Sequence, residues 1–195
     1  MSQADDPARF RQAAEAIDAY NREDPHGREL EQAQAVVGWI RRLRPHASEA
    51  LLLAGRAHHI GRWRIPRNRY PRNRHGYLRW RRDLQAFHAD EAGRLLAGCG
   101  CPPALVDRVR CIIRKQRLQD DAEVQALEDA LCLVFIERQL AEFRYQHDDA
   151  KLQRIIRRTW AKMSPAGHAA ALALAVPEDV RALLERSLGG SDTGA

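Results

Sequence analysis

The sequence lacks the features that mark several common classes of protein. It has no apolar run approaching the roughly 20 residues of a membrane helix, and its start, MSQADDPARF, lacks the basic-then-apolar pattern of a signal segment. The Gly-rich phosphate loop, the nucleophile elbow and the dinucleotide-binding fingerprint are also missing. We therefore expect a cytoplasmic protein with no membrane partner, and we exclude kinase, hydrolase-triad and Rossmann chemistry.

Cysteine is sparse and is not spaced for metal binding. The four cysteines are Cys99, Cys101, Cys111 and Cys132. A Cys-x-Cys pair without a second close pair leaves a tetrahedral zinc site incomplete. We therefore expect reduced thiols, as is usual in a cytosolic chain.

Lysine is scarce, and acidic residues are absent from one long stretch. Of the 32 lysines and arginines only three are lysines, and no acidic residue lies between Glu49 and Asp83. Ten arginines fall between Arg56 and Arg82. Because guanidinium binds phosphate through a planar, often bidentate fork, this stretch predicts an anionic partner. The partner could be a phosphorylated small molecule, a nucleic acid or an acidic protein.

Strict alternation of apolar and polar residues, the pattern of a half-buried strand, is nearly absent. Apolar residues instead recur at spacings of three and four, which predicts an all-α protein. The length favours one helical domain over residues 1–188, with a disordered tail at 189–195. The expected helices cover residues 7–20, 29–43, 49–62, 77–98, 103–115, 122–143, 149–163, 165–173 and 177–187. The third is apolar on nearly every side, so we expect it at the centre of the fold.

A long loop is expected over residues 64–77, where Pro66 and Pro71 interrupt the helical periodicity. Aromatic residues are interleaved with the arginines of this region and need a surface to pack on, which argues against disorder. The candidate substrate-binding residues are Arg62, Trp63, Arg67, Arg69, Tyr70, Arg72, Arg74, Tyr77, Trp80 and Arg81.

Two adjacent histidines, His58 and His59, precede this loop. Adjacent helical positions point about 100° apart, so at most one of the two is expected to be an ideal metal ligand. Alternatively, each is a core histidine satisfied by hydrogen bonds. His88 and Glu91 stand three residues apart on the next expected helix, the spacing that di-metal carboxylate bundles also use.

Glu128 and Asp129 interrupt the apolar stripe of a later helix. A carboxylate there is costly unless it meets a cation, a metal or a hydrogen-bond donor. An ion pair with an arginine of the basic loop is one possible explanation, and a functional site is the other.

The order of these motifs resembles a known family. Ala-His-His-Ile-Gly, the basic loop, Tyr-Leu-Arg-Trp-Arg, Ile-Ile-Arg-Lys and Leu-Glu-Asp-Ala-Leu-Cys-Leu-Val-Phe follow one another as in the family catalogued as domain of unknown function 4202. The resemblance covers roughly residues 17–163. That family is similar, more distantly, to the HD superfamily of metal-dependent phosphohydrolases, which are all-α and bind metals between helices.

The HD similarity implies a metal site. It matches His58 and His59 to the His-Asp pair, His88 to an accessory histidine and Asp129 to a distant aspartate. The chain departs from the HD pattern at the early histidine, which falls near Gln32, and in the pair itself, where histidine replaces aspartate.

The same similarity implies a divalent ion, namely Mn, Fe, Zn or Mg, which would activate a water and polarise a phosphoryl oxygen. Glu91 or Glu128 would relay the proton. Lys115 stands where some HD members have another histidine, and it is a third candidate catalytic residue.

Three functions therefore remain open, and each requires a different geometry. A metal-dependent phosphohydrolase acting on a nucleotide or related phosphoester requires His59 and Asp129 to converge. A non-catalytic module for RNA or a phospho-ligand requires exposed arginines within residues 62–82 and a free ring from Trp63, Tyr70 or Trp80. A structural or protein-interaction domain would instead fold its arginines and aromatics inward.

Overall fold

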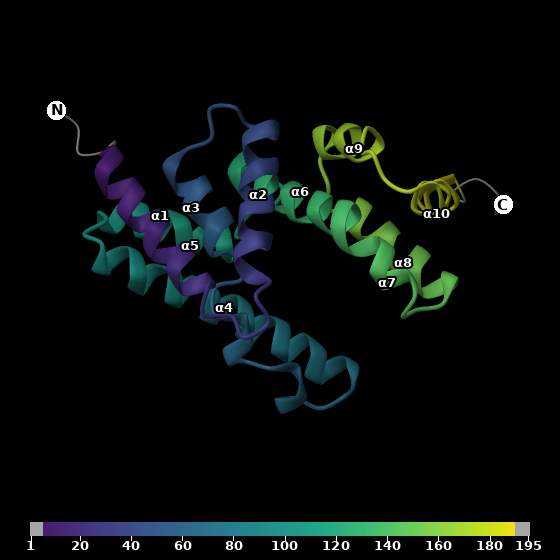
Figure 1. Ribbon diagram of the computed structural model, residues 1–195, viewed down its shortest axis with the longest axis horizontal. Helices are drawn as coiled ribbons and strands as arrows, with labels where there is room; N and C mark the ends of the chain where they lie inside the picture. Colours follow the sequence, from purple (N-terminus) through teal and green to yellow (C-terminus); the bar gives the residue numbers. More distant parts are fainter. Residues whose placement is uncertain (1–5, 190–195) are drawn as a thin grey trace. The chain divides into compact units, whose positions relative to one another are not determined.

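The chain is all-helical, as the apolar spacing predicts. The computed structural model describes residues 6–189, and no strand occurs within that range (Figure 1). The chain forms two compact units, which meet in the sequence at the junction between Leu127 and Glu128. None of the described helices combines the length and the apolar character needed to cross a membrane.

Unit 1 contains five complete helices and the start of a sixth. These are α1 (Pro7–Asn21), α2 (Glu29–Leu43), α3 (Glu49–Ala57), α4 (Arg74–Gly98), α5 (Pro103–Ile113) and α6 (Ala122–Val134), with 3-10 turns η1 (Arg62–Arg64) and η2 (Arg67–Arg69) between α3 and α4. Side-chain caps start several of them: Asp6 caps α1 and Ser48 caps α3, each by accepting hydrogen bonds from backbone N–H groups.

The core of unit 1 surrounds α3, as its apolar sequence predicts. Helices α1, α2, α4 and α5 all pack against it, and Leu53 and Ala54 are fully buried. A methyl group added at Gly55 would lie 2.5 Å from the Cδ1 atom of Ile40. The missing side chain therefore permits the close approach of α2 and α3.

Helix α3 ends at Ala57, so the predicted helix over residues 49–62 was wrong in its last turn. The chain leaves the helix through Gly61, whose φ of 66° lies in the left-handed region that favours glycine. A Cβ atom at Gly61 would also lie 2.8 Å from the ring of Phe87. These two constraints turn the chain out of the core directly after the two histidines.

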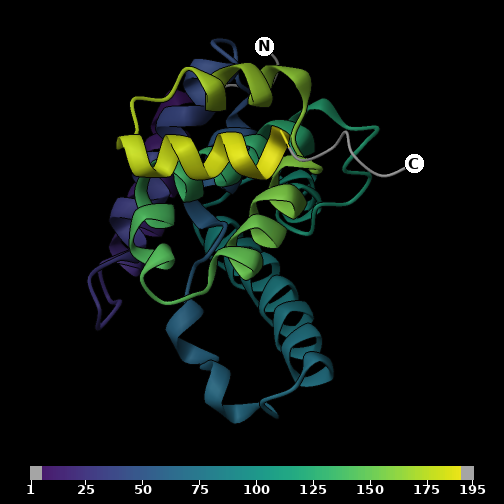
Figure 2. The ribbon, with the colours of Figure 1, turned by 90° about the vertical axis from the view of Figure 1, so that its right-hand side faces the viewer.

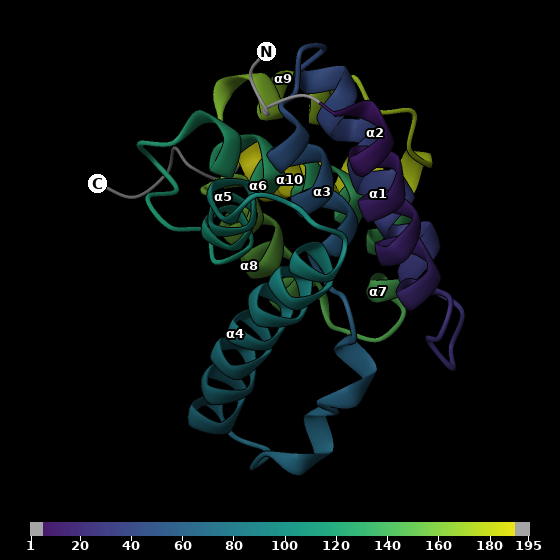
Figure 3. The same ribbon diagram turned by 90° about the vertical axis from the view of Figure 1, so that its left-hand side faces the viewer.

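We call the segment Arg62–Arg82 the arginine arm. It comprises η1, η2 and the first turns of α4, and it extends away from the other helices of unit 1 (Figures 2 and 3). The predicted loop over residues 64–77 was too long. Helix α4 begins at Arg74, because the side chain of Asn73 caps its first turn.

Unit 2 contains the end of α6 and four further helices. It continues through a π-helical turn η3 (Phe135–Gln139), α7 (Leu140–Arg144), α8 (Asp149–Trp160), α9 (Pro165–Leu172) and α10 (Glu178–Gly189). The expected helix over residues 122–143 is therefore interrupted by a π-helical turn. Residues 190–195 of the predicted disordered tail lie outside the described residues.

Candidate functional site

Two buried histidines of unit 1 share one hydrogen-bonding pattern. The Nδ1 atom of His58 lies 2.8 Å from the carbonyl oxygen of Gly55, and that of His88 lies 2.7 Å from the carbonyl oxygen of Ile60. A carbonyl oxygen only accepts, so each Nδ1 carries the proton and donates it. The two Nε2 atoms are therefore acceptors, and both are buried without a hydrogen-bond partner.

His59 lies between these two rings. Its ring centroid is 4.2 Å from that of His58 and 5.6 Å from that of His88. We call His58, His59 and His88 the histidine cluster. The structure thus brings together three of the four predicted metal ligands, although 30 positions separate the first from the last in the sequence.

The histidine cluster is electrically neutral at physiological pH. Burial lowers the pKa of His58 to about 3 and that of His88 to about 4, and it holds the pKa of His59 well below the ordinary value. Neighbouring cations lower these pKa values further. Arg62 lowers the pKa of all three histidines, and Lys115 lowers the pKa of His58 and of His59. Neutral imidazole is the form that offers a lone pair to a ligand.

Glu29, at the start of α2, is a member of this site that the sequence reasoning missed. Its Oε2 atom is buried without a hydrogen-bond partner and lies 3.7 Å from the Nδ1 atom of His59. Burial raises the pKa of Glu29 to about 7. The available signal was its place three residues before Gln32, because residues three apart lie on the same face of a helix.

As arranged, the described residues complete no metal site. Across residues 6–189, no group of three or more histidine, cysteine, aspartate or glutamate side chains is placed to hold a metal ion. Asp129 belongs to unit 2, where its carboxylate accepts hydrogen bonds from the backbone N (2.8 Å) and the Oγ atom (2.5 Å) of Ser164. Because Ser164 also caps α9, Asp129 anchors the start of that helix.

Glu128 and Glu91, the two residues predicted to relay a proton, each form an ion pair with a cationic side chain. Glu128 is buried in unit 2, and its Oε1 atom lies 3.6 Å from the Nζ atom of Lys162. Glu91 accepts hydrogen bonds from Arg94 at 2.8 Å and 3.2 Å, and this arginine lowers the pKa of Glu91. Both carboxylates are therefore held by ion pairs. The predicted catalytic residue Lys115 is half-buried directly after α5.

The arginines of the arm are mostly exposed. The arm contains nine arginines and no acidic residue, and seven of the nine are exposed. Arg64 pairs with Glu23, and Arg79 and Arg82 both approach Asp83. Four exposed arginines of the arm remain, and none of them forms an ion pair with a described acidic residue: Arg69, Arg72, Arg74 and Arg81.

Two arginines of the arm face inward instead. Arg67 donates hydrogen bonds to the carbonyl oxygens of Tyr70 (2.9 Å) and Pro71 (2.8 Å), so it holds the turn of the arm. Arg62 lies over the ring of Trp80, with its guanidinium carbon 5.1 Å from the ring centroid. Of the predicted binding arginines, the exposed ones are Arg69, Arg72, Arg74 and Arg81.

The aromatic residues of the arm divide into packed rings and one exposed ring. Trp80 is buried, Trp63 packs near Tyr20 with ring centroids 5.8 Å apart, and the hydroxyl of Tyr70 donates to Asp83 at 3.0 Å. Tyr77 is 45 % exposed. Of the three rings that the binding-module hypothesis names, Trp80 is buried and Trp63 and Tyr70 are half-buried, so the exposed ring is one that the hypothesis did not name.

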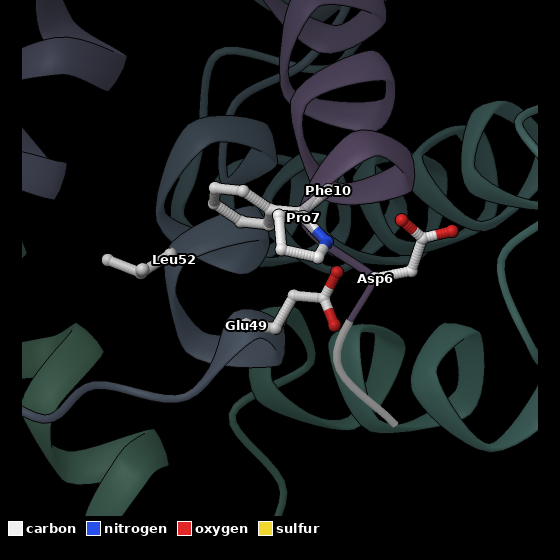
Figure 4. A pocket seen from close by; sticks show the side chains of 5 residues that line it. All are labelled: Asp6, Pro7, Phe10, Glu49 and Leu52. Carbon is white, nitrogen blue, oxygen red and sulfur yellow. The ribbon is translucent and has the colours of Figure 1, made fainter. Parts of the chain in front are cut away.

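A separate hollow of about 250 Å³ lies at the N-terminal ends of α1 and α3 (Figure 4). It is lined by Asp6, Pro7, Phe10, Glu49 and Leu52. The histidine cluster follows the opposite end of α3, about 13 Å along the helix. The hollow therefore belongs to a different part of unit 1 from the cluster.

The motif order and the helical fold together agree with a single family assignment. The model of a domain of unknown function, DUF4202, matches residues 11–184. The chain belongs to this family. The matched range includes both the histidine cluster and the arginine arm, so both are parts of the DUF4202 domain. No curated protein and no solved structure matches the chain.

Proposed function

We propose that unit 1 of this DUF4202 protein is a nucleic-acid-binding module whose binding element is the arginine arm. One observation supports the proposal. The arm extends from unit 1, it contains nine arginines and no acidic residue, and seven of the nine arginines are exposed. Three of these exposed arginines, Arg72, Arg74 and Arg81, form no ion pair with a described carboxylate. A phosphate can therefore bind them without displacing one.

A polymer of phosphates fits the arm better than a single phosphate does. The exposed arginines are distributed over η1, η2 and the first turns of α4 rather than converging on one point. Neutralising several phosphates in a row releases bound counterions, and this release supplies most of the affinity of non-specific nucleic-acid binding. Arginine also suits this partner because its planar fork pairs with phosphate in a bidentate manner.

The test compares two triple variants that lose the same charge. Arg72, Arg74 and Arg81 are changed to Gln in one variant, and the exposed Arg22, Arg28 and Arg41 of unit 1 are changed to Gln in the control. Binding of a fluorescent RNA strand of about 16 nucleotides is measured by anisotropy. We expect the arm variant to bind at least about tenfold more weakly than the control, a difference of about 1.4 kcal/mol. Equal affinity of the two variants would contradict the proposal.

A second candidate function is metal-dependent phosphoester hydrolysis, and one observation favours it. The Nε2 atoms of His58 and His88 are buried acceptors without partners, while each Nδ1 donates to a carbonyl oxygen. Metal-binding imidazoles are held in this same way. Each unpartnered acceptor costs about 1–3 kcal/mol, which an occupant of the cluster would recover. The third ligand is not in place among the described residues, so we assign no catalytic step.

The second candidate is tested by elemental analysis of protein purified without chelator. About one equivalent of a transition metal, lost in His58→Ala and His88→Ala and retained in the exposed control His46→Ala, supports a metal centre. Hydrolysis of nucleotides and phosphodiesters is then assayed with the same set. A parent protein that stays free of metal after incubation with manganese, iron or zinc contradicts this candidate.

A further inference from the structure

Among the tyrosine and tryptophan rings of the arginine arm, that of Tyr77 is exposed, and it packs against the buried ring of Trp80. Tyr77 lies in the first turn of α4 with 45 % of its surface exposed. Its ring centroid is 6.0 Å from that of Trp80, at an interplanar angle of 47°. The ring of Tyr77 therefore packs in a tilted arrangement against Trp80, and much of its surface stays exposed to solvent.

Trp80 is a rigid support for this ring. It is buried, its Nε1 atom donates a hydrogen bond to the carbonyl oxygen of Ile65 at 2.8 Å, and the guanidinium of Arg62 lies 5.1 Å from its ring centroid. A ring that is already held by its neighbour loses little side-chain entropy when it binds a ligand.

Two exposed arginines flank Tyr77 on the same face of α4. Arg74 precedes it by three residues and Arg81 follows it by four, and these spacings place side chains side by side on a helix. The two arginines are about 10 Å apart along the helix axis, at 1.5 Å per residue. An exposed ring between two unpaired cations offers a surface for one planar group with phosphates on either side.

We infer that Tyr77 is a stacking platform for an unpaired base, so that the arm binds single strands in preference to duplex. This inference rests on the proposed nucleic-acid function. In a duplex both faces of each base are covered by neighbouring bases, whereas an unpaired base can stack on an aromatic side chain. The other tyrosine and tryptophan rings of the arm are packed or hydrogen-bonded, so we assign the single-strand preference to Tyr77.

The inference is tested with three single variants of exposed residues. Tyr77→Ala removes the ring, Tyr77→Phe keeps it, and Leu78→Ala removes the neighbouring exposed apolar side chain, which is 54 % exposed. Affinities for a single RNA strand and for the corresponding duplex are measured side by side, and thermal melting checks that each variant is folded. A stacked base contributes about 1–3 kcal/mol, which corresponds to about 5- to 150-fold in affinity.

We expect Tyr77→Ala to lose about 5- to 150-fold in affinity for the single strand and less than about twofold for the duplex. Tyr77→Phe and Leu78→Ala should both bind the single strand like the parent. Equal losses in Tyr77→Ala and Leu78→Ala, or equal losses for strand and duplex, would overturn the inference. Vesicles containing phosphatidylserine serve as a further ligand, and tighter binding to them than to RNA would overturn it as well.

The two proposals fail in distinguishable ways. If the parent protein binds neither strand nor duplex, the proposed function fails. If it binds both and the Tyr77→Ala variant matches the parent, the function stands and the stacking platform alone is wrong.

Discussion

The indole Nε1 of Trp80 donates a hydrogen bond to the carbonyl oxygen of Ile65 across 2.8 Å, joining the two limbs of the arginine arm. One limb contains η1 and η2, and the other is the first part of α4. The hydrogen bond from the Tyr70 hydroxyl to Asp83 joins the same two limbs at 3.0 Å. Two hydrogen bonds therefore hold together the two limbs of a segment that carries nine like charges.

Removal of the indole hydrogen bond should loosen the arm. Trp80→Phe keeps an aromatic ring but leaves the Ile65 carbonyl without this donor, so we expect a loss of about 1 kcal/mol in the free energy of unfolding. RNA affinity should fall as well, because ordering the arm would then oppose binding. Urea denaturation and anisotropy measure the two effects. Trp63→Phe is the control, and equal stability losses in both variants would contradict the role of the hydrogen bond.

Gly76, in the first turn of α4, should not tolerate a side chain. A Cβ atom there would collide with the backbone carbonyl of Pro71, which cannot move as a flexible side chain does. Gly76→Ala should therefore destabilise unit 1 by about 1–3 kcal/mol. At Gly38, in α2, nothing lies within 4 Å of an added Cβ, so Gly38→Ala should be neutral or stabilising by up to about 1 kcal/mol. The melting temperature should fall in Gly76→Ala and should not fall in Gly38→Ala. A similar fall in both variants would refute the prediction.

Acid should destabilise unit 1 through its buried histidines. The pKa of His88 is lowered by burial to about 4 in the folded protein, against an ordinary value of 6.5. Between these values the unfolded chain binds more protons, so stability falls as the pH drops below about 6.5. The melting temperature of His88→Gln should depend less on pH between about 6.5 and 4 than that of the parent. The exposed control His46→Ala should keep the parent's dependence, and an unchanged slope in His88→Gln would contradict the argument.

Glu29 should have the opposite pH dependence. Burial raises its pKa from 4.5 to about 7, so the folded state binds more protons than the unfolded chain between these values. Its contribution to stability is complete below about pH 4.5 and is lost as the pH rises through about 7. Glu29→Gln should therefore melt above the parent at pH 8 and lose this advantage at pH 5. The exposed control Glu15→Gln should show no such pH-dependent difference in melting temperature from the parent. If Glu29→Gln also shows none, the assignment is refuted.

The local features of the fold were predictable from the sequence. The apolar run after Ser48 correctly predicted a central helix. The arginine segment left open whether its side chains are exposed or folded inward, and the structure exposes seven of the nine in the arm. The end of α3 at Ala57 was missed, because it depends on the left-handed turn at Gly61 and on the distant ring of Phe87. Periodicity reports which face of a helix is buried, but it does not report tertiary collisions at a helix end.

The site itself was predictable only in part. The residue types of the histidine cluster were identified from the sequence. The shared orientation of His58 and His88, however, arises from two backbone carbonyls, that of Gly55 within α3 and that of Ile60 in the turn that follows it. Glu29 was missed because an acidic residue at a helix start ordinarily indicates a solvated first turn. The inward role of Arg67 was equally hidden, because nothing in a run of arginines tells which guanidinium will meet backbone carbonyls.

The central claim, that the arginine arm binds nucleic acid, is tested most directly by the salt dependence of RNA affinity. Each phosphate neutralised on a single strand contributes about 0.7 to the slope of log affinity against log salt concentration. Between about 50 and 200 mM salt, the Arg72, Arg74 and Arg81 triple variant should show a slope about 2 units shallower than the parent. The control triple variant at Arg22, Arg28 and Arg41 should keep the parent slope. Identical slopes in all three proteins would contradict the claim.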